Sequence, residues 1–256
     1  MSRIIYEPEG RAREYAPLAA NLYTGCPHGC LYCFGPSTLK KKKAVFHSSY
    51  GPKARAIERL SKDASKLRRL GDTGEILLSF VTDPYLPEEM DWGITRAAIE
   101  VLIANGLHFT ILTKGGTRAV RDFDLLANYP KARFGTTIVF SNPESARHYE
   151  PEAPDIYDRI QAIKEAHDRG IKTWVSLEPV IFPDQALDLI QGLHHVVDHW
   201  KIGKLNGRKP PEPVDWGKFR KDAKTLLDSL EADYYLKNSL GPGCNASPPQ
   251  AVGGLP

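Results

Sequence analysis

The sequence predicts an α/β fold, a partial or near-complete (βα) TIM-type barrel with parallel strands. The length of 256 residues suits one large domain, and 41% hydrophobic with 25% charged residues is a globular composition. Short apolar runs alternate with longer amphipathic runs along most of the chain. Because each pair of parallel strands needs a crossover, usually a helix, this alternation indicates a parallel sheet covered by helices. A flat doubly wound sheet is the alternative.

The expected strands are short apolar runs bounded by polar or turn-forming residues. They cover residues 20–23, 75–81, 108–112, 134–140, 172–177, 196–202 and 234–237. The expected helices between them carry apolar residues three or four positions apart, and glycine follows several of them. They cover residues 53–70, 93–104, 118–127, 155–169, 184–191 and 215–230.

Polar residues stand where the expected strands end. They are Thr82-Asp83, Thr113-Lys114, Ser141-Asn142, Glu178 and Lys204. Catalytic groups of (βα) barrels lie at the carboxyl ends of the strands. These residues therefore predict the functional face of the barrel.

Residues 1–240 are expected to form the barrel domain, and residues 241–256 a tail. The tail holds four glycines and four prolines, which disfavour any regular element. The chain has no run of 18 or more uncharged apolar residues, and its start lacks the apolar core of a signal peptide. We therefore expect a cytoplasmic protein with no membrane partner.

Positive charge is concentrated in the segment from Lys40 to Arg69. The whole chain has a net charge of +3, whereas this segment has eleven basic residues against Glu58 and Asp63, a net +9. A local field of this kind attracts anions, so nucleic acid is a candidate partner. A solvated helix face with a flexible loop is the alternative interpretation.

Three of the four cysteines are clustered. Cys26, Cys30 and Cys33 form a C-x3-C-x2-C pattern within residues 25–35, and Cys244 lies alone near the end. Thiolates bind zinc or iron–sulfur clusters. Structural zinc requires four ligands, and His28 would be a strained fourth ligand inside so tight a loop. Three ligands suit a [4Fe–4S] cluster with one iron left open, and zinc remains the alternative.

This loop, with Tyr32 before its last cysteine and a first strand before it, resembles that of the radical S-adenosylmethionine enzymes. The resemblance implies a [4Fe–4S] cluster held by Cys26, Cys30 and Cys33, with S-adenosylmethionine on the fourth iron. Reductive cleavage would give a 5′-deoxyadenosyl radical that abstracts a substrate hydrogen. An external one-electron donor of the flavodoxin or ferredoxin type is then a partner.

The resemblance also implies cofactor contacts. Asp83 would accept hydrogen bonds from the methionine ammonium, where the family's usual Gly-Gly-Glu is absent, and Lys114 would pair with the methionine carboxylate. Ser141 and Asn142 would bind the ribose, and the Tyr32 backbone would contact the adenine. Glu178 is a further candidate for binding the cofactor. Glu178 and Lys204 are also candidate contacts of the substrate.

Residues 22–26, 82–88 and 111–114 resemble the spore photoproduct lyase-like branch, and residues 176–181 resemble phage-associated relatives of it. That branch implies a DNA-lesion or nucleotide substrate, phosphate contacts from Lys40–Arg69, and Cys244 as a hydrogen-atom donor. A peptide or small-metabolite substrate is the alternative within the enzyme class. A zinc-stabilised nucleic-acid-binding module is the alternative outside it.

Overall fold

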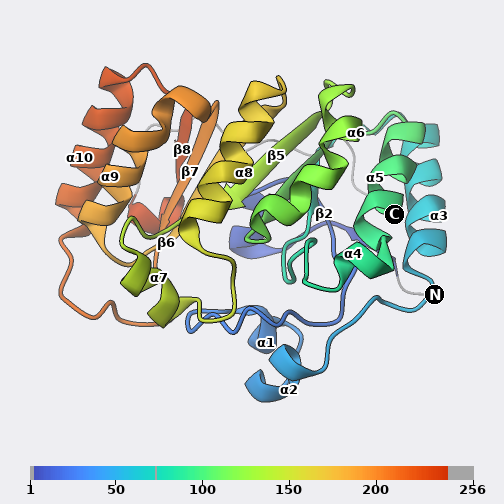
Figure 1. Cartoon of the computed structure of the whole chain (residues 1–256), viewed down its shortest axis with the longest axis horizontal. Helices are drawn as coiled ribbons and strands as arrows, with labels where there is room; N and C mark the ends of the chain where they lie inside the picture. The colour runs from blue at the N-terminus through green and yellow to red at the C-terminus, as the bar shows by residue number, and fades with distance from the viewer. Residues whose placement is uncertain (1–2, 73, 242–256) are drawn as a thin grey trace.

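The chain folds around one eight-stranded sheet (Figure 1), and the computed structural model describes residues 3–72 and 74–241. The strands follow one another across the sheet in sequence order, with β1 and β8 at its edges. They are β1 (Ile5–Tyr6), β2 (Leu18–Ala20), β3 (Ile76–Leu78), β4 (Phe109–Thr113), β5 (Ala132–Thr137), β6 (Lys172–Val180), β7 (His199–Lys204) and β8 (Tyr234–Leu236). The predicted α/β class is confirmed.

One strand differs from the expected parallel arrangement. β1 pairs antiparallel with β2, and every later pair is parallel. With only two residues, β1 is too short to produce a periodic signal in the sequence. The sheet is therefore mostly, rather than entirely, parallel.

Helices follow most of the strands. The α-helices are α1 (Gly35–Thr38), α2 (Lys43–Ser48), α3 (Ala56–Leu70), α4 (Glu89–Trp92), α5 (Ile94–Ala104), α6 (Phe123–Ala127), α7 (Pro143–Tyr149), α8 (Ile156–Asp168), α9 (Pro183–Leu193) and α10 (Trp216–Ser229). Short 3₁₀ helices are η1 (Gly10–Glu14), η2 (Gly116–Asp122), η3 (His194–Val196) and η4 (Asn238–Leu240). No helix in the described ranges is long and apolar enough to cross a membrane.

Several element boundaries differ from the expected ones. The strands expected over 20–23 and 75–81 are β2 and β3, which end at Ala20 and Leu78, because the Asn21 side chain accepts the amides of Phe80 and Val81 beyond that point. The helix expected over 118–127 is η2 followed by α6, and the hydroxyl and amide of Thr117 at its start are bonded to Asp158 of α8. Residues 138–140 follow β5 rather than extend it, and Val139 and Phe140 are apolar because they pack against Tyr149. The strand expected from 196 begins at His199, since η3 occupies the residues before it.

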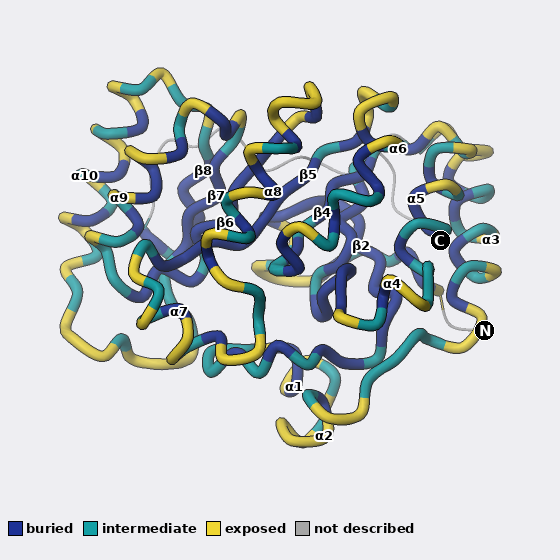
Figure 2. The backbone as a smooth tube through the Cα atoms, in the orientation of Figure 1, coloured by how far each residue is buried: buried dark blue, intermediate teal, exposed yellow. Residues whose placement is uncertain are grey.

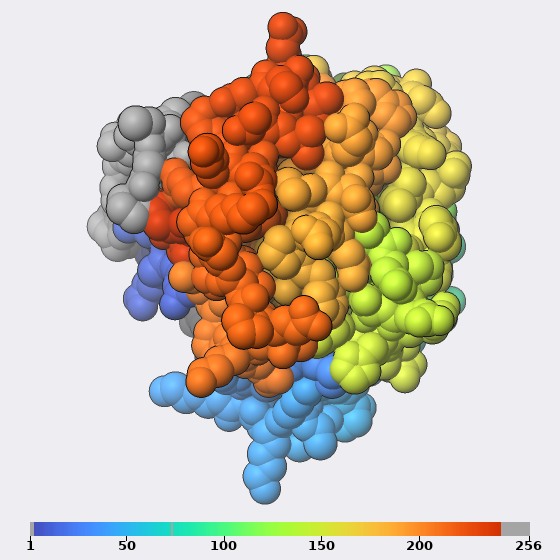
Figure 3. All heavy atoms as spheres, turned by 90° about the vertical axis from the view of Figure 1, so that its left-hand side faces the viewer, coloured from blue at the N-terminus to red at the C-terminus, as the bar shows by residue number. Residues whose placement is uncertain are grey.

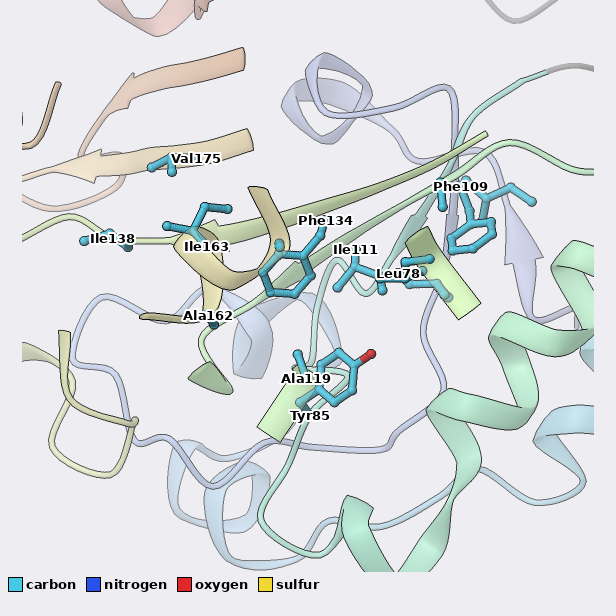
Figure 4. Packing of buried hydrophobic residues seen from close by; sticks show 14 of the residues in the cluster. Leu78, Tyr85, Phe109, Ile111, Ala119, Phe134, Ile138, Ala162, Ile163 and Val175 are labelled. Carbon is cyan, nitrogen blue, oxygen red and sulfur yellow. The ribbon is translucent and has the colours of Figure 1, made fainter. Parts of the chain in front are cut away.

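The outer face of the sheet forms the main core with the helices. Figure 4 shows Ala162 and Ile163 of α8 beside Phe134 of β5, and all three are fully buried. Figure 2 shows the same layering, with buried strands inside and exposed turns on the outer side of α10. Burial of this apolar surface is the main force that holds the helices to the sheet.

The inner face of the sheet closes around the N-terminal segment. The ring of Tyr15, just before β2, lies 6.2 Å from the ring of Trp174 of β6, measured between centroids. The ammonium of Lys237, just after β8, lies 3.3 Å from the centroid of the Tyr15 ring. A Cβ at Gly135 would lie 2.2 Å from the Trp174 ring, so only glycine fits there. Side chains from near both edges of the sheet thus meet at Tyr15, as in an open, partial barrel.

Candidate active site

The clustered cysteines lie in the loop between β2 and α1, at the carboxyl edge of the parallel strands. Helices α1, α4 and α7, which follow β2, β3 and β5, gather at this edge, the lower side of Figure 1. Cys26 and Cys30 are buried, whereas Cys33 is half-buried. Burial raises the pKa of Cys26, and it raises that of Cys30 to about 12.

Helix α2 holds one side of the cysteine loop. The amide of Cys26 donates to the carbonyl of Phe46 at 3.2 Å. A Cβ at Gly25 would lie 2.3 Å from that same oxygen, so the close approach requires glycine before the first cysteine. The last residue of α7 holds the other side, because the amide of Leu31 donates to Tyr149 O at 2.8 Å.

A buried charge network anchors the loop more firmly. We call Tyr32, Lys114, Glu150 and Arg159 the Glu150 network. The Tyr32 hydroxyl donates to Glu150, the Arg159 guanidinium lies 2.6 Å from its carboxylate, and Lys114 Nζ lies 3.8 Å from it. Burial raises the pKa of Glu150, but Arg159 and Lys114 outweigh burial and hold it below its ordinary value. The network therefore carries charge inside the protein.

Lys114, predicted from the sequence, is placed beside the cysteines. Its ammonium lies 5.4 Å from the centroid of the Tyr32 ring. Burial lowers the pKa of Lys114, but the neighbouring Cys30 and Glu150 raise it above its ordinary value. Lys114 is thus a protonated cation next to Cys30, and its contact with a methionine carboxylate stays a prediction.

Asp83 is a structural hub where β3 and β4 end. Its Oδ1 accepts hydrogen bonds from Tyr85 N at 2.8 Å and Thr113 Oγ1 at 2.6 Å, and its Oδ2 accepts from Lys114 N at 2.6 Å. His28 Nδ1 lies 3.7 Å from Oδ2, and burial lowers the pKa of His28 to about 4. Asp83 thus links the segment after β3 to the end of β4 and lies near His28 of the cysteine loop, and its contact with the methionine ammonium stays a prediction.

Ser141 and Asn142 lie where the chain enters α7. Asn142 is its N-cap, accepting from Glu144 N, and Ser141 Oγ donates to Asp188 at 3.1 Å. Both residues line an open depression at the start of α7 and α8. Their contact with a ribose stays a prediction. Cys244 lies outside the described residues.

Glu178 lies in a second polar group, inside the sheet. We call Tyr15, Ser176, Glu178 and Lys237 the Glu178 network. Glu178 Oε2 accepts from the Tyr15 hydroxyl at 2.5 Å and from the Lys237 ammonium, and Tyr15 Oη lies 3.0 Å from Ser176 Oγ. Lys204 does not join it, because its ammonium lies 5.9 Å from the ring centroid of Trp216 on α10, outside the sheet.

Sequence reasoning missed several residues of both networks. Lys237 is the last residue of the strand expected over 234–237, so the same carboxyl-end rule that selected Lys114 points to it as well. Arg159 stands among the buried positions of α8, where an unpaired charge would be costly. Glu150 and Tyr15 lie in polar segments without periodicity, and nothing in the pattern distinguishes them.

The basic segment is divided between two places. Residues 40–43, which we call the lysine loop, connect α1 to the first residue of α2, in the part that projects below α9 and α10 in Figure 3. Lys41 Nζ donates to the carbonyl of Thr24, two residues before Cys26. Helix α3 lies at the side of the molecule, where Arg55 and Lys62 pair with Glu58. Only the lysine loop adjoins the cysteines.

Comparison with curated proteins finds relatives of similar sequence. An uncharacterized protein of Methanocaldococcus jannaschii is 30% identical over 169 residues, which cover 66% of this chain and 62% of the relative. An uncharacterized protein of Acidianus two-tailed virus is 26% identical over 176 residues, which cover 65% of this chain and 57% of the relative. The chain thus spans less than two thirds of either relative.

Solved structures show the same fold. Spore photoproduct lyase complexed with dinucleoside spore photoproduct has a TM-score of 0.67 and 16% identity, with 90% of this chain and 78% of that chain covered. SuiB from Streptococcus suis bound to S-adenosylmethionine has a TM-score of 0.62 and 12% identity, with 85% of this chain and 45% of that chain covered. The family model described as the radical SAM superfamily matches residues 20–195. This chain therefore belongs to the radical SAM superfamily, whose members are enzymes.

Proposed function

We propose that this protein cleaves S-adenosylmethionine reductively with a [4Fe–4S] cluster held by Cys26, Cys30 and Cys33, and directs the resulting radical to a nucleotide or nucleic-acid substrate. The observation that carries the proposal is the position of these cysteines, together on one loop at the carboxyl edge of a radical SAM fold. That edge is where barrel enzymes build their active sites.

The residues present fit such a cluster. The loop offers three thiols, soft donors that suit iron–sulfur centres, and two of them are shielded from water. Among residues 3–72 and 74–241, no three His, Cys, Asp or Glu side chains are grouped so as to hold a single metal ion. When bound and reduced, the cluster supplies the electron that cleaves the sulfonium and yields the 5′-deoxyadenosyl radical.

This chain's own residues would bind and orient the cofactor. The protonated Lys114 beside Cys30 supplies a positive charge for the methionine carboxylate. Asp83, which links the segment after β3 to the end of β4 beside the loop, is assigned to the ammonium. The Tyr32 backbone is assigned to the adenine, and Ser141 with Asn142 to the ribose. An external donor of the flavodoxin or ferredoxin type would supply the electron.

The lysine loop next to the cysteines supports an anionic substrate. Lys40, Lys42 and Lys43 are exposed in the stretch between α1 and α2, so phosphate groups can approach from this side. The structural neighbour solved with a dinucleoside spore photoproduct belongs to the same superfamily fold. SuiB has also been solved with its precursor peptide SuiA, so a peptide is the competing substrate class.

The test is anaerobic reconstitution with iron and sulfide, followed by reduction in the presence of S-adenosylmethionine and assay for 5′-deoxyadenosine. We expect product from the native chain and none from Cys30→Ala, because loss of this thiolate would leave one iron of the cluster without its protein ligand. Cys30→Ala should also lose the broad visible absorption of the cluster. A colourless, zinc-loaded native protein that makes no 5′-deoxyadenosine would overturn the proposal.

A further inference from the structure

Three aromatic rings lie in a row from the cysteine loop into the sheet, exposed at Phe34, half-buried at Phe80 and buried at Tyr15. Phe34 directly follows Cys33, yet its side chain is 47% exposed. Its ring lies 5.1 Å from that of Phe80, and the Phe80 ring lies 5.7 Å from that of Tyr15. We call Phe34 and Phe80 the aromatic wall. An exposed aromatic ring beside a reaction centre offers a face on which a planar ligand can stack.

Hydrogen-bond acceptors lie on the other side of Tyr15. Oε2 of Glu178 is saturated, since the Tyr15 hydroxyl and Lys237 both donate to it. Oε1 has one weak partner, Asn206 Nδ2 at 3.5 Å, and that nitrogen also donates to the carbonyl of Lys204 at 2.9 Å. Within the described ranges, no group donates to Asn206 Oδ1. We call Glu178 Oε1 and Asn206 Oδ1 the acceptor pair.

These acceptors can be reached from solvent. The Glu178 side chain is 15% exposed, and Asn206 is half-buried. A Cβ at Gly203 would lie 2.8 Å from Glu178 Oε1, so glycine is required there for the carboxylate to lie in this position. A carboxylate oxygen and an amide oxygen that both lack strong donors favour a ligand with N–H groups.

We propose that the aromatic wall and the acceptor pair form a subsite for a planar substrate ring that carries an N–H group, a nucleobase in chemical class. The ring would stack on the wall and donate its N–H to the acceptor pair, with Tyr15 between them. This inference rests on the proposed function and specifies its substrate. Stacking on aromatic side chains is how proteins commonly hold unpaired bases.

Binding by itself tests the subsite, without radical chemistry. The reconstituted protein, saturated with S-adenosylhomocysteine, is titrated by calorimetry with thymidine and 2′-deoxyguanosine. Their N3-methyl and N1-methyl derivatives, which lack the ring N–H, and 2-deoxyribose, which lacks the ring, serve as comparison ligands. We expect at least one parent nucleoside to bind, at least tenfold more tightly than its methylated form, and 2-deoxyribose not to bind.

Variants locate the binding. Phe34→Ala should weaken binding of the parent nucleoside roughly 5- to 100-fold, as for one base–aromatic stack. Asn206→Ala, in an exposed loop, should weaken it about 2- to 10-fold by removing one acceptor. The matched control is Leu70→Ala, which removes an apolar side chain that is 57% exposed at the end of α3 and should leave binding unchanged.

The binding experiment tests the subsite independently of the assay for S-adenosylmethionine cleavage. Absence of binding by both nucleosides, or equal binding by methylated forms or by Phe34→Ala, would overturn the subsite even if 5′-deoxyadenosine is formed. Ring-selective binding that depends on Phe34 would support the subsite even if the cleavage assay fails.

Discussion

Two carboxylates of this protein, the buried Glu150 and the half-buried Glu178, have similar partners but different surroundings. Each accepts a hydrogen bond from a tyrosine, Tyr32 or Tyr15, and each pairs with a buried cation. Both oxygens of Glu150 are engaged and its side chain is fully buried, whereas Glu178 keeps one oxygen almost unused and partly exposed. The Glu150 network is therefore closed and suited to stabilise the fold, whereas the Glu178 network is open and suited to bind a ligand.

The closed network joins three separate parts of the chain. Tyr32 belongs to the cysteine loop, Lys114 follows β4, and Arg159 lies on α8. A charge buried in a low-dielectric interior must be paired to be tolerated. The position of the cysteine loop is therefore coupled to the presence of Glu150.

The largest expected effect comes from Glu150→Gln. This change keeps the shape of the side chain but leaves the cations of Arg159 and Lys114 buried without a counter-charge. We expect the free energy of unfolding to fall by about 3–5 kcal/mol, the usual cost of breaking a buried ion pair. Urea denaturation of the native and variant proteins, followed by circular dichroism, measures the difference.

The matched control is Glu165→Gln. Glu165 lies on α8, the helix that carries Arg159, and the change breaks its ion pair with Arg169 at the surface. Such surface pairs contribute about 0–1 kcal/mol. If the two variants lost equal stability, Glu150 would not be the structural anchor inferred here.

The open network adjoins a lysine whose charge is costly. Lys201 of β7 is 5% exposed, and its ammonium donates to the carbonyl of Glu14 at 3.3 Å and to that of Tyr15. Burial lowers the pKa of Lys201 from 10.5 to about 7. Between these two values the unfolded chain binds more protons at this residue than the folded chain. The contribution of Lys201 to stability must therefore rise with pH across that range.

Lys201→Met should remove this pH dependence. Above pH 7, the unfolding free energy of the native protein should increase relative to that of the variant by about 1.4 kcal/mol per pH unit. Urea titrations at several pH values between 6.5 and 9.5 measure it. Lys172→Met, at an exposed lysine, should show no such slope. A constant difference across the range would mean that Lys201 stays protonated in the fold.

The sheet and the cysteine loop could be predicted from sequence because both depend on local pattern. Apolar runs such as 76–78 and 109–113 form strands wherever helices cover them, and three thiols within eight residues indicate metal chemistry on their own. The boundaries near 138–140 were wrong because buried loop residues are as apolar as strand residues.

The partners of the site residues could not be predicted in this way. Glu150 meets Tyr32 across 118 positions, and Tyr15 meets Glu178 across 163. These contacts arise only when the sheet curves and the N-terminal segment enters it. Asp83 and Lys114 stand at predicted strand ends, but their links to Thr113 and to Glu150 depend on that same arrangement.

The smallest expected effect compares the two tyrosines. Tyr32→Phe and Tyr15→Phe each remove one hydroxyl that donates to a carboxylate and keep the ring. Glu150 has no route to water, so Tyr32→Phe should lower the unfolding free energy by about 1–2 kcal/mol. Glu178 keeps Lys237 and is partly hydrated, so Tyr15→Phe should cost about 0.5–1 kcal/mol. Urea denaturation resolves this difference, and a larger loss for Tyr15→Phe would show that the Glu178 network, not the Glu150 network, is the closed one.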